Sequence, residues 1–348
     1  MKAASAIGVR ARGLSEVPLE FLNAKLRGRR ARLYEGARLR RLAEQDNVQD
    51  LAYELFPRED LVTQVELEQH LTAECARELG RFAPYVTGAY GALYDALLSH
   101  FAVENLKVLL RVLGREDARR LADRHTVPLP ARLELPVDEL LRSRDEQQFA
   151  ARIPLPSVRS AVQAALPLFE ETERRGFLEM AMDRGRWEAV AAALEALPRG
   201  DREACRPPIA CESDGLRLAG ALRAATVYEM PWERFEALLP AGPGELSVAD
   251  LRGVYARPQS ETVLQALPEL RHFLEDPGLA GSAGALEEAM WRRTLREANR
   301  QYYGRMSGPA ILVSYYYLKR NERRSLAMLA QMLRVGVRRR RIRERLGL

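Results

Sequence analysis

Apolar and polar positions alternate along the chain mainly with the spacing of an α-helix. Long amphipathic runs of this kind cover 178–197 and 263–274. Apolar residues at positions i, i+3, i+4 and i+7 mark one buried helix face. They occur at Leu106, Leu109, Leu110 and Leu113, and again at Leu326, Leu329, Ala330 and Leu333. No segment shows the alternation of a strand over a useful length. The pattern therefore predicts an all-α protein.

Two of these helices belong to a pattern that occurs three times. Each copy has an acid or its replacement, two further residues, then Asn, Gly or Ser, and then Leu; the copies lie at 102–107, 212–217 and 322–327. Their leucines, Leu106, Leu216 and Leu326, are separated by 110 residues each time. The second copy is the weakest, because Ala219, Gly220 and Arg223 occupy its expected apolar positions.

A period this long indicates three tandem helical bundles packed together rather than a solenoid. We expect bundles at 21–130, 131–240 and 241–348, each of about 110 residues, after an N-terminal tail at 1–20. The third bundle ends in a basic helix. Prolines are predicted to interrupt the helices; they lie at Pro84, 128–136, 154–156, 207–208 and the 240–244 turn.

Charge is distributed unevenly along the chain. The segments 25–41 and 334–348 together carry +13, so the remainder carries −7 of the net +6. Basic ends and an acidic middle suit docking between two different partners. An alternative is that arginine-rich helix surfaces are simply solvated.

The expected environment is the cytosol. The cysteines, Cys75, Cys205 and Cys211, are too few and odd in number for a disulfide framework, which favours a reducing compartment. The N-terminal apolar stretch is only seven residues long, and the longest uncharged stretch, 306–318, has thirteen. A membrane-spanning helix takes about 20 apolar residues, so neither a secretory signal nor a membrane span is predicted.

No motif for catalysis, cofactor binding or metal binding stands out. The glycine-spaced stretch 278–284 lacks the lysine of a phosphate-binding loop. The four histidines lie far apart, and Cys205 and Cys211 have neither zinc-ligand nor redox-pair spacing. We therefore expect no catalytic, cofactor-binding or metal-binding residues.

The run 338–341, followed by Arg343 and Arg345, could neutralise the phosphates of nucleic acid. A helical nucleic-acid-binding or regulatory scaffold is therefore the alternative function. The preceding residues 315–317 are three tyrosines. Consecutive helical residues point in different directions, so we expect protein packing rather than a stacking platform for bases.

Several segments resemble one family. The opening Phe21-Leu22-Asn23-Ala24-Lys25-Leu26-Arg27, with Arg30 and Leu33, resembles the aromatic-x-Asn-Ala-Arg-x-Arg start of the C/d family of V/A-type (vacuolar/archaeal-type) ATPase subunits. The helices at 104–111, 212–217 and 317–326 are similar to that family's repeated helices. This chain departs from the family at Lys25, Ala102, Gly215 and Ser325.

The resemblance implies a funnel-like, threefold pseudo-symmetric helical subunit without a catalytic site. Such a subunit sits on the cytoplasmic face of the proteolipid ring and receives the tip of the central stalk in its hollow. The implied partners are the central-stalk subunits, the proteolipid ring and, as a further candidate, the membrane stator subunit; no nucleic acid and no cofactor are expected. Its implied role is to couple the stalk to proton or sodium transport.

Two kinds of partner-binding residue follow from these observations. The basic ends are expected to lie together as one positive patch for acidic partner groups or anionic lipid headgroups, and equivalent helices are candidates for gripping the stalk. For the helix residues we also consider a structural role, in which acids near a helix start interact favourably with the helix dipole and the Asn beside them caps the helix. The candidate residues are Arg27, Arg30, Glu104, Asn105, Arg111, Glu212, Arg217, Glu322, Arg338 and Arg340.

Overall fold

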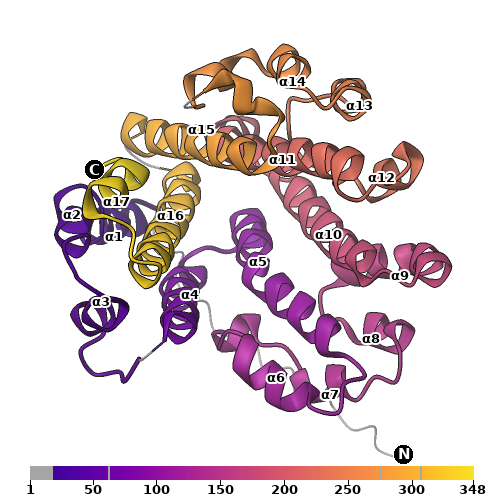
Figure 1. Cartoon of the computed structure of the whole chain (residues 1–348), viewed down its shortest axis with the longest axis horizontal. Coiled ribbons are helices and arrows are strands. Elements are labelled where there is room, and N and C mark those ends of the chain that lie inside the picture. The colour runs from indigo at the N-terminus through magenta and orange to yellow at the C-terminus, as the bar shows by residue number, and fades with distance from the viewer. Residues whose placement is uncertain (1–18, 62, 275, 306–307) are drawn as a thin grey trace, which may run out of the picture.

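The computed structural model describes residues 19–61, 63–274, 276–305 and 308–348, and every regular element in these ranges is a helix, which confirms the all-α prediction (Figure 1). Of the predicted tail at 1–20, only Leu19 and Glu20 are described, and they begin the first helix. The α-helices are α1 (Leu19–Arg30), α2 (Ala37–Leu42), α3 (Val48–Leu55), α4 (Gln64–Gly80), α5 (Gly88–Val112), α6 (Ala118–His125), α7 (Val137–Leu141), α8 (Glu146–Arg152), α9 (Pro156–Thr172), α10 (Arg175–Glu195), α11 (Arg199–Thr226), α12 (Trp232–Leu238), α13 (Val248–Ala256), α14 (Ser260–Ala266), α15 (Ala283–Gly304), α16 (Pro309–Arg334) and α17 (Arg339–Leu346). Short 3-10 helices are η1 (Ala83–Tyr85), η2 (Ala131–Leu133), η3 (Pro268–His272) and η4 (Pro277–Gly281).

Six long helices follow one another in a closed ring. Helix α4 contacts α5, α5 packs on α10, α10 contacts α11, α11 packs on α15, α15 packs on α16, and α16 returns to α4 (Figure 1). The first and last thirds of the chain therefore meet. This cyclic order suits the predicted threefold funnel, which stays a prediction, as do the bundle boundaries at 130 and 240.

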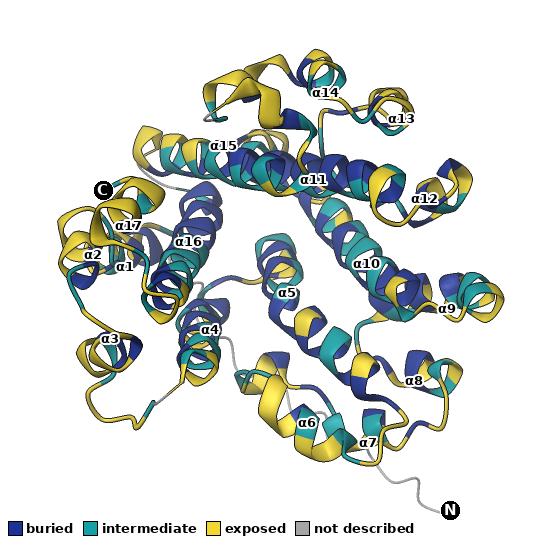
Figure 2. Ribbon diagram, viewed as in Figure 1, coloured by how far each residue is buried: buried dark blue, intermediate teal, exposed yellow. Residues whose placement is uncertain are grey.

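The short helices lie outside the ring. Buried residues concentrate on the long helices, whereas α2, α13 and α17 show much exposed surface (Figure 2). Helices α2, α3 and α17 share one apolar cluster with the start of α4 and the end of α16. The short helices thus cover the outer surface of the ring.

The repeated leucines lie in three long helices of the ring. Leu106 is in α5, Leu216 in α11 and Leu326 in α16. Leu106 and Leu326 are buried, as the helical periodicity predicts, whereas Leu216 is half-buried. The pattern therefore marks the long helices, but it assigns the second copy less well.

The three tyrosines of α16 connect it to three other helices. Tyr315, Tyr316 and Tyr317 are each fully buried. Their hydroxyls donate to the Glu78 carboxylate of α4, to the Leu97 carbonyl of α5 at 3.0 Å, and to the Glu212 carboxylate of α11 at 2.9 Å. Successive helical residues point about 100° apart, which lets three neighbouring side chains reach three different helices. The expectation of protein packing is confirmed for all three.

Two predictions about the helices are wrong: one interruption and one continuous helix. Pro207 and Pro208 do not interrupt a helix but lie inside α11. Their neighbours Cys205 and Ile209 are fully buried, so tertiary packing holds the helix through the prolines despite the missing N–H groups. The run at 263–274 is not one α-helix: α14 ends at Ala266, and a 3-10 helix begins at Pro268.

Candidate partner-binding surfaces

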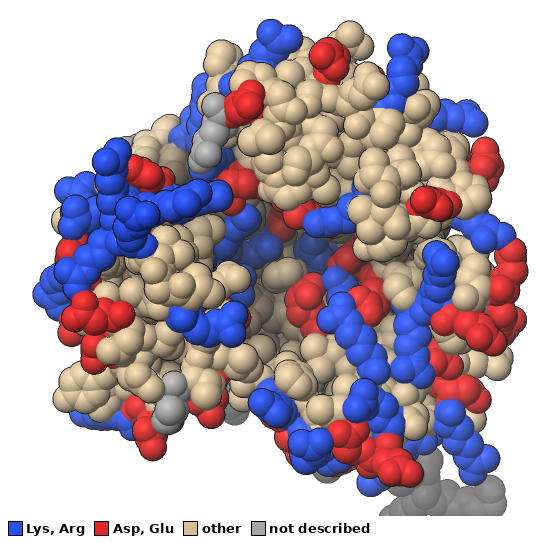
Figure 3. Space-filling model, in the orientation of Figure 1, with Lys and Arg blue, Asp and Glu red and all other residues tan. Residues whose placement is uncertain are grey.

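An open hollow lies at the centre of the ring. Its volume is about 280 Å³, and α5, α10, α11, α15 and α16 line it. Figure 3 shows this hollow with both acidic and basic side chains around it. The lining residues are His100, Glu104, Lys107, Asp183, Arg186, Trp187, Glu212, Gly215, Leu216, Glu287, Met290, Trp291, Thr294 and Arg324. Of the ten candidate residues, only Glu104 and Glu212 belong to this lining.

Ion pairs across the hollow join neighbouring helices. Lys107 of α5 lies 2.9 Å from Glu104 and 2.8 Å from Asp183 of α10. Burial lowers the pKa of Lys107, but the two carboxylates more than offset it, so the net pKa is raised and the amine stays charged. Glu104 is half exposed, and this makes it the candidate residue of the hollow that a partner can reach.

Glu212 is part of a buried pair that connects α11 to α16. Its carboxylate lies 2.8 Å from a guanidinium nitrogen of Arg320, and both side chains are less than 15% exposed. Burial raises the pKa of Glu212, but the charges of Arg320 and Arg186 more than offset it, so the net pKa is lowered. The Arg320 guanidinium also lies over the Trp291 ring, 5.2 Å from its centroid. Glu212 thus has a structural contact of its own.

Glu322 lies away from the hollow, at the closure of the ring. It is 3% exposed, accepts a hydrogen bond from the Tyr34 backbone N–H at 2.8 Å, and pairs with Lys319. Lys319 in turn lies 3.1 Å from Glu78 of α4. Glu322 therefore holds the turn after α1 against α16, and its partner Lys319 links α16 to α4.

Asn105 does not cap a helix, so the capping expectation is wrong for this residue. It lies deep in α5, because the helix begins at Gly88. Its side-chain amide donates to the Val127 carbonyl at 2.8 Å, and its side-chain oxygen accepts from the Val127 N–H at 2.9 Å. Asn105 thus anchors the segment that follows α6. Glu212 and Glu322 also lie inside their helices rather than at the starts.

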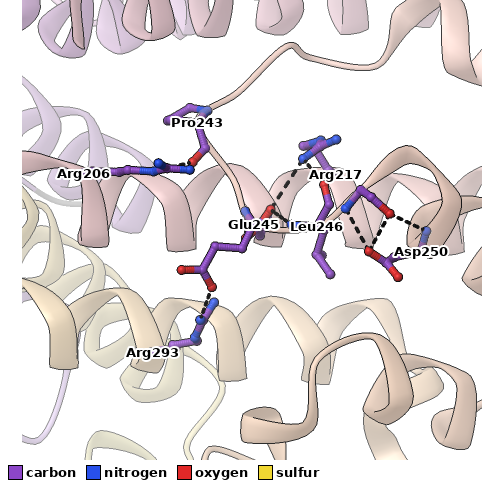
Figure 4. Close-up of polar contacts among 9 residues, drawn as sticks. Arg206, Arg217, Pro243, Glu245, Leu246, Asp250 and Arg293 are labelled. Carbon is purple, nitrogen blue, oxygen red and sulfur yellow. Dashed lines mark hydrogen bonds and ion pairs between the residues drawn. The ribbon is translucent and has the colours of Figure 1, made fainter. Parts of the chain in front are cut away.

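In the second copy of the repeat, the anchor is shifted by one residue. Asp214 accepts hydrogen bonds from the backbone N–H groups of Glu245 at 2.8 Å and Leu246 at 3.2 Å. Arg217 donates to the Leu246 carbonyl at 2.8 Å (Figure 4). Gly215, which replaces the expected Asn, packs so closely on α15 that a Cβ there would lie 2.8 Å from Met290. The neighbouring Asp214 therefore does the anchoring.

The anchored segment lies directly on α11. A Cβ at Gly242 would meet the Ser213 hydroxyl at 1.7 Å, and one at Gly244 would meet the Asp214 carboxylate at 2.0 Å. Figure 4 shows this segment held by Arg206 of α11, through the Pro243 carbonyl, and by Arg293 of α15, through Glu245. Arg217 is itself buried, and it holds the Leu246 carbonyl of this segment, so its role here is structural.

Arg111 lies on the outside of the α5–α10 contact. Its Nε and Nη2 donate to the two carboxylate oxygens of Glu179 at 2.8 and 2.5 Å. The side chain is 60% exposed. This pair joins two helices of the ring but does not face the hollow.

The later part of the first basic end lies beside the second basic end, as expected for these residues. Leu39 and Leu42 of α2 share an apolar cluster with Ile342 of α17, and Arg339 and Arg343 form ion pairs with Asp46 and Glu44. We call the exposed arginines of α2, of the end of α16 and of 338–345 the basic patch, visible at the left of Figure 3. The basic patch comprises Arg38, Arg40, Arg41, Arg334, Arg338, Arg339, Arg340, Arg341, Arg343 and Arg345.

The other two basic candidates have local contacts. Arg27 donates to the Arg305 carbonyl at 2.8 Å, and Arg30 pairs with Glu35 and reaches Asn299 at 3.5 Å. Both lie beside the end of α15 rather than in the basic patch.

The repeat pattern does not identify most of the residues that line the hollow. Arg186, Trp187 and Trp291 line it, but none belongs to the repeated motif or to a basic end. Arg186 and Trp187 do lie within the amphipathic run 178–197, where one arginine stands between Gly185 and Trp187. That periodicity predicts the helix but not which of its charges face inward.

The described part of the chain lacks two kinds of feature. No helix there is long and apolar enough to cross a membrane. No group of three or more His, Cys, Asp or Glu side chains within those ranges is arranged to hold a metal ion.

Comparison with known proteins identifies the family. A family model described as ATP synthase (C/AC39) subunit matches residues 22–345. A search of curated proteins found no match. The family match confirms the resemblance inferred from the N-terminal and repeated motifs. Because it spans nearly the whole sequence, the chain belongs to the ATP synthase (C/AC39) subunit family, whose members are subunits of hetero-oligomeric V/A-type rotary ATPases.

Proposed function

We propose that this chain is the non-catalytic coupling subunit of the central stalk, and that it links the stalk tip to the proteolipid ring for proton or sodium transport. The observation that carries the proposal is the charged hollow at the centre of a closed ring of helices. A coupling subunit must be rigid and must hold two partners. Buried ion pairs between ring helices supply rigidity, and the hollow and the basic patch supply two separate attachment surfaces.

In this proposal the stalk tip enters the hollow. Glu104 and its neighbours on α5, α10, α11 and α15 contact the tip. The basic patch faces acidic groups or anionic lipid headgroups of the membrane sector, including the stator as a further candidate partner. The subunit then lies peripherally on the cytoplasmic face of the membrane.

The alternative function, nucleic-acid binding by the arginine-rich end, has less support. The family match over residues 22–345 favours a place in the rotary complex instead.

Site-directed labelling tests the hollow as the stalk-binding surface. The native cysteines are buried, and burial raises the pKa of each thiol to about 12, so they react poorly with maleimide at neutral pH. A Glu104→Cys variant therefore places a single reactive thiol in the hollow. Glu116→Cys, on the exposed turn before α6, is the matched control.

We expect bound stalk subunits to protect the thiol introduced at position 104 from labelling, and a bulky maleimide on it to block their binding. The thiol introduced at position 116 should label equally in both states. Equal labelling of both positions with the stalk bound would contradict the proposal. Affinity purification from solubilised membranes should recover stalk and proteolipid subunits; recovery of nucleic acid alone would favour the alternative.

A further inference from the structure

Arg186 differs from every other charged residue of the hollow. Each of the others has an ion-pair partner in the described residues: Glu104, Lys107 and Asp183 pair together, Glu212 pairs with Arg320, Glu287 with Arg223, and Arg324 with Glu288. Arg186 has neither an ion pair nor a hydrogen bond to any described residue. It is the one charged side chain of the lining that has no direct partner in the described part of the chain.

Burial makes this arrangement costly. Arg186 is only 4% exposed, and its Nε and Nη1 are buried without a hydrogen-bond partner. Its guanidinium lies over the adjacent Trp187 ring, with Cζ 4.5 Å from the ring centroid. This cation–π contact stabilises the charge but leaves the N–H donors without acceptors. A buried charge that lacks a partner destabilises a fold. A function in binding is a physical reason for keeping it.

The carboxylates of Asp183 and Glu212 act on Arg186 through their charge, but each makes its close ion pair with another cation. Asp183 is paired with Lys107, and Glu212 is paired with Arg320. His100 adds no positive charge, since burial and the surrounding cations keep its pKa low and the ring neutral. Among the described residues, the Arg186 guanidinium therefore has no carboxylate of its own to accept its hydrogen bonds.

The rest of the lining indicates which kind of acceptor fits these N–H donors. Leu216, Met290 and Trp291 form an apolar part of the wall. A free phosphate ion would leave this surface uncovered, whereas a protein side chain brings an aliphatic stem with its carboxylate. Guanidinium groups bind carboxylates through strong charge-assisted hydrogen bonds.

We propose that Arg186 is the receptor for a single carboxylate of the stalk tip, which enters the hollow and pairs with the free guanidinium. This inference rests on the proposed function, because it assumes that the stalk occupies the hollow. It adds the chemistry of the contact: one acidic group of the partner, held by one arginine of α10, with apolar contacts beside it.

The test compares Arg186→Met and Arg186→Lys with the wild-type chain in binding to purified central-stalk subunits. Arg186→Met keeps the aliphatic packing and removes the charge. We expect about 30-fold weaker binding or more for Arg186→Met, as for other desolvated charge pairs across interfaces, and an intermediate loss for Arg186→Lys. The control is Arg111→Met, whose guanidinium is already paired with Glu179 outside the hollow; its binding should change less than about threefold.

Unfolding measurements distinguish a receptor from a structural arginine. Because Arg186→Met removes an unpaired buried charge, the variant should be at least as stable as the wild type while binding is lost. A loss of stability parallel to the loss of binding would assign Arg186 a structural role and overturn the inference.

A double-mutant cycle identifies the carboxylate. Each acid of the stalk tip is replaced by its amide, and one replacement should weaken binding to the wild type but have no further effect on Arg186→Met. Additive effects at every position would overturn the inference. It would also be overturned if sodium phosphate alone stabilised the wild type but not Arg186→Met, while no acid of the stalk tip showed coupling to Arg186.

If the stalk binds wild type and Arg186→Met equally, the inference fails and the proposed function stands. If the wild type does not bind the stalk, the proposed function fails.

Discussion

The charges of the ring interior and those of the basic patch are used differently. In the interior, Glu212 and Arg320 pair with less than 15% exposure, and each has further contacts to aromatic side chains. In the basic patch, Arg340 is 92% exposed and pairs with Glu344 one turn away. Buried pairs join helices, and removing one member alone is costly, whereas exposed pairs contribute little to stability and leave charge available for partners. Position in the fold, rather than residue type, thus separates structural charges from binding charges.

The largest effect should come from breaking the Glu212–Arg320 pair. Replacing one member leaves the other buried and uncompensated, so Arg320→Met should lower the free energy of unfolding by about 3–5 kcal/mol. Urea denaturation with helical circular dichroism measures it. The double variant Glu212→Leu with Arg320→Met removes both charges and should recover part of the loss. Equal destabilisation of the single and double variants would show that the pair as such is not the cause.

A smaller effect is expected at Asn105. Its side chain satisfies both backbone groups of Val127, so Asn105→Ala should lower the free energy of unfolding by about 1–3 kcal/mol. Binding to the stalk should be retained under conditions where the variant is folded. Normal stability with lost stalk binding would instead make Asn105 a contact residue. Gln163→Ala, which removes an exposed amide from the surface of α9, is a control of similar chemistry.

The ring interior should also make stability pH-dependent. Burial first, and then Arg320 and other cations, keep the pKa of His100 well below its ordinary value of 6.5. Below about pH 6.5 the unfolded chain binds a proton that the folded chain does not, so stability decreases as the pH falls, by at most about 1.4 kcal/mol per pH unit from this group. His100→Gln should flatten the dependence of the urea midpoint between pH 7 and 5. His125→Gln, on the exposed end of α6, controls for loss of an imidazole; an unchanged slope in His100→Gln would refute the assignment.

The smallest effect on stability, and the sharpest contrast with the interior, is expected in the basic patch. Arg340→Glu should leave the urea midpoint nearly unchanged but weaken assembly with the membrane sector, most strongly at low salt. Arg199→Glu is a matched control, because Arg199 is also highly exposed and pairs with an acid four residues later. Assembly can be followed by co-sedimentation with membranes at several salt concentrations. Equal behaviour of the two variants at every salt concentration would refute a binding role for the patch.

The sequence predicts the helices of this fold better than its contacts. The 110-residue repeat correctly marks α5, α11 and α16, because burying one face of a long helix requires a regular apolar pattern. The contiguity of the two basic ends was also expected from the repeat. The helical continuation through Pro207 and Pro208 was not, because tertiary packing outweighs the local preference of proline.

The candidate residues show the limit of reasoning from a motif. The motif selects Asn105, Glu212 and Glu322, which are engaged in contacts within the chain. It does not select Arg186, whose distinguishing property is the lack of a partner. Whether a charge is paired depends on which helices meet in space, and no spacing along the sequence gives that information.

The closure of the ring has a consequence for biosynthesis. Helix α4 ends at Gly80, but it packs on α16, which begins at Pro309. The first helices therefore leave the ribosome with an apolar surface that can be covered only when nearly the whole chain has been made. Contacts between such distant segments form slowly, and partly made chains with exposed apolar surface tend to aggregate. A nascent chain that stalls before residue 309 should thus depend on chaperones, however stable the completed protein is.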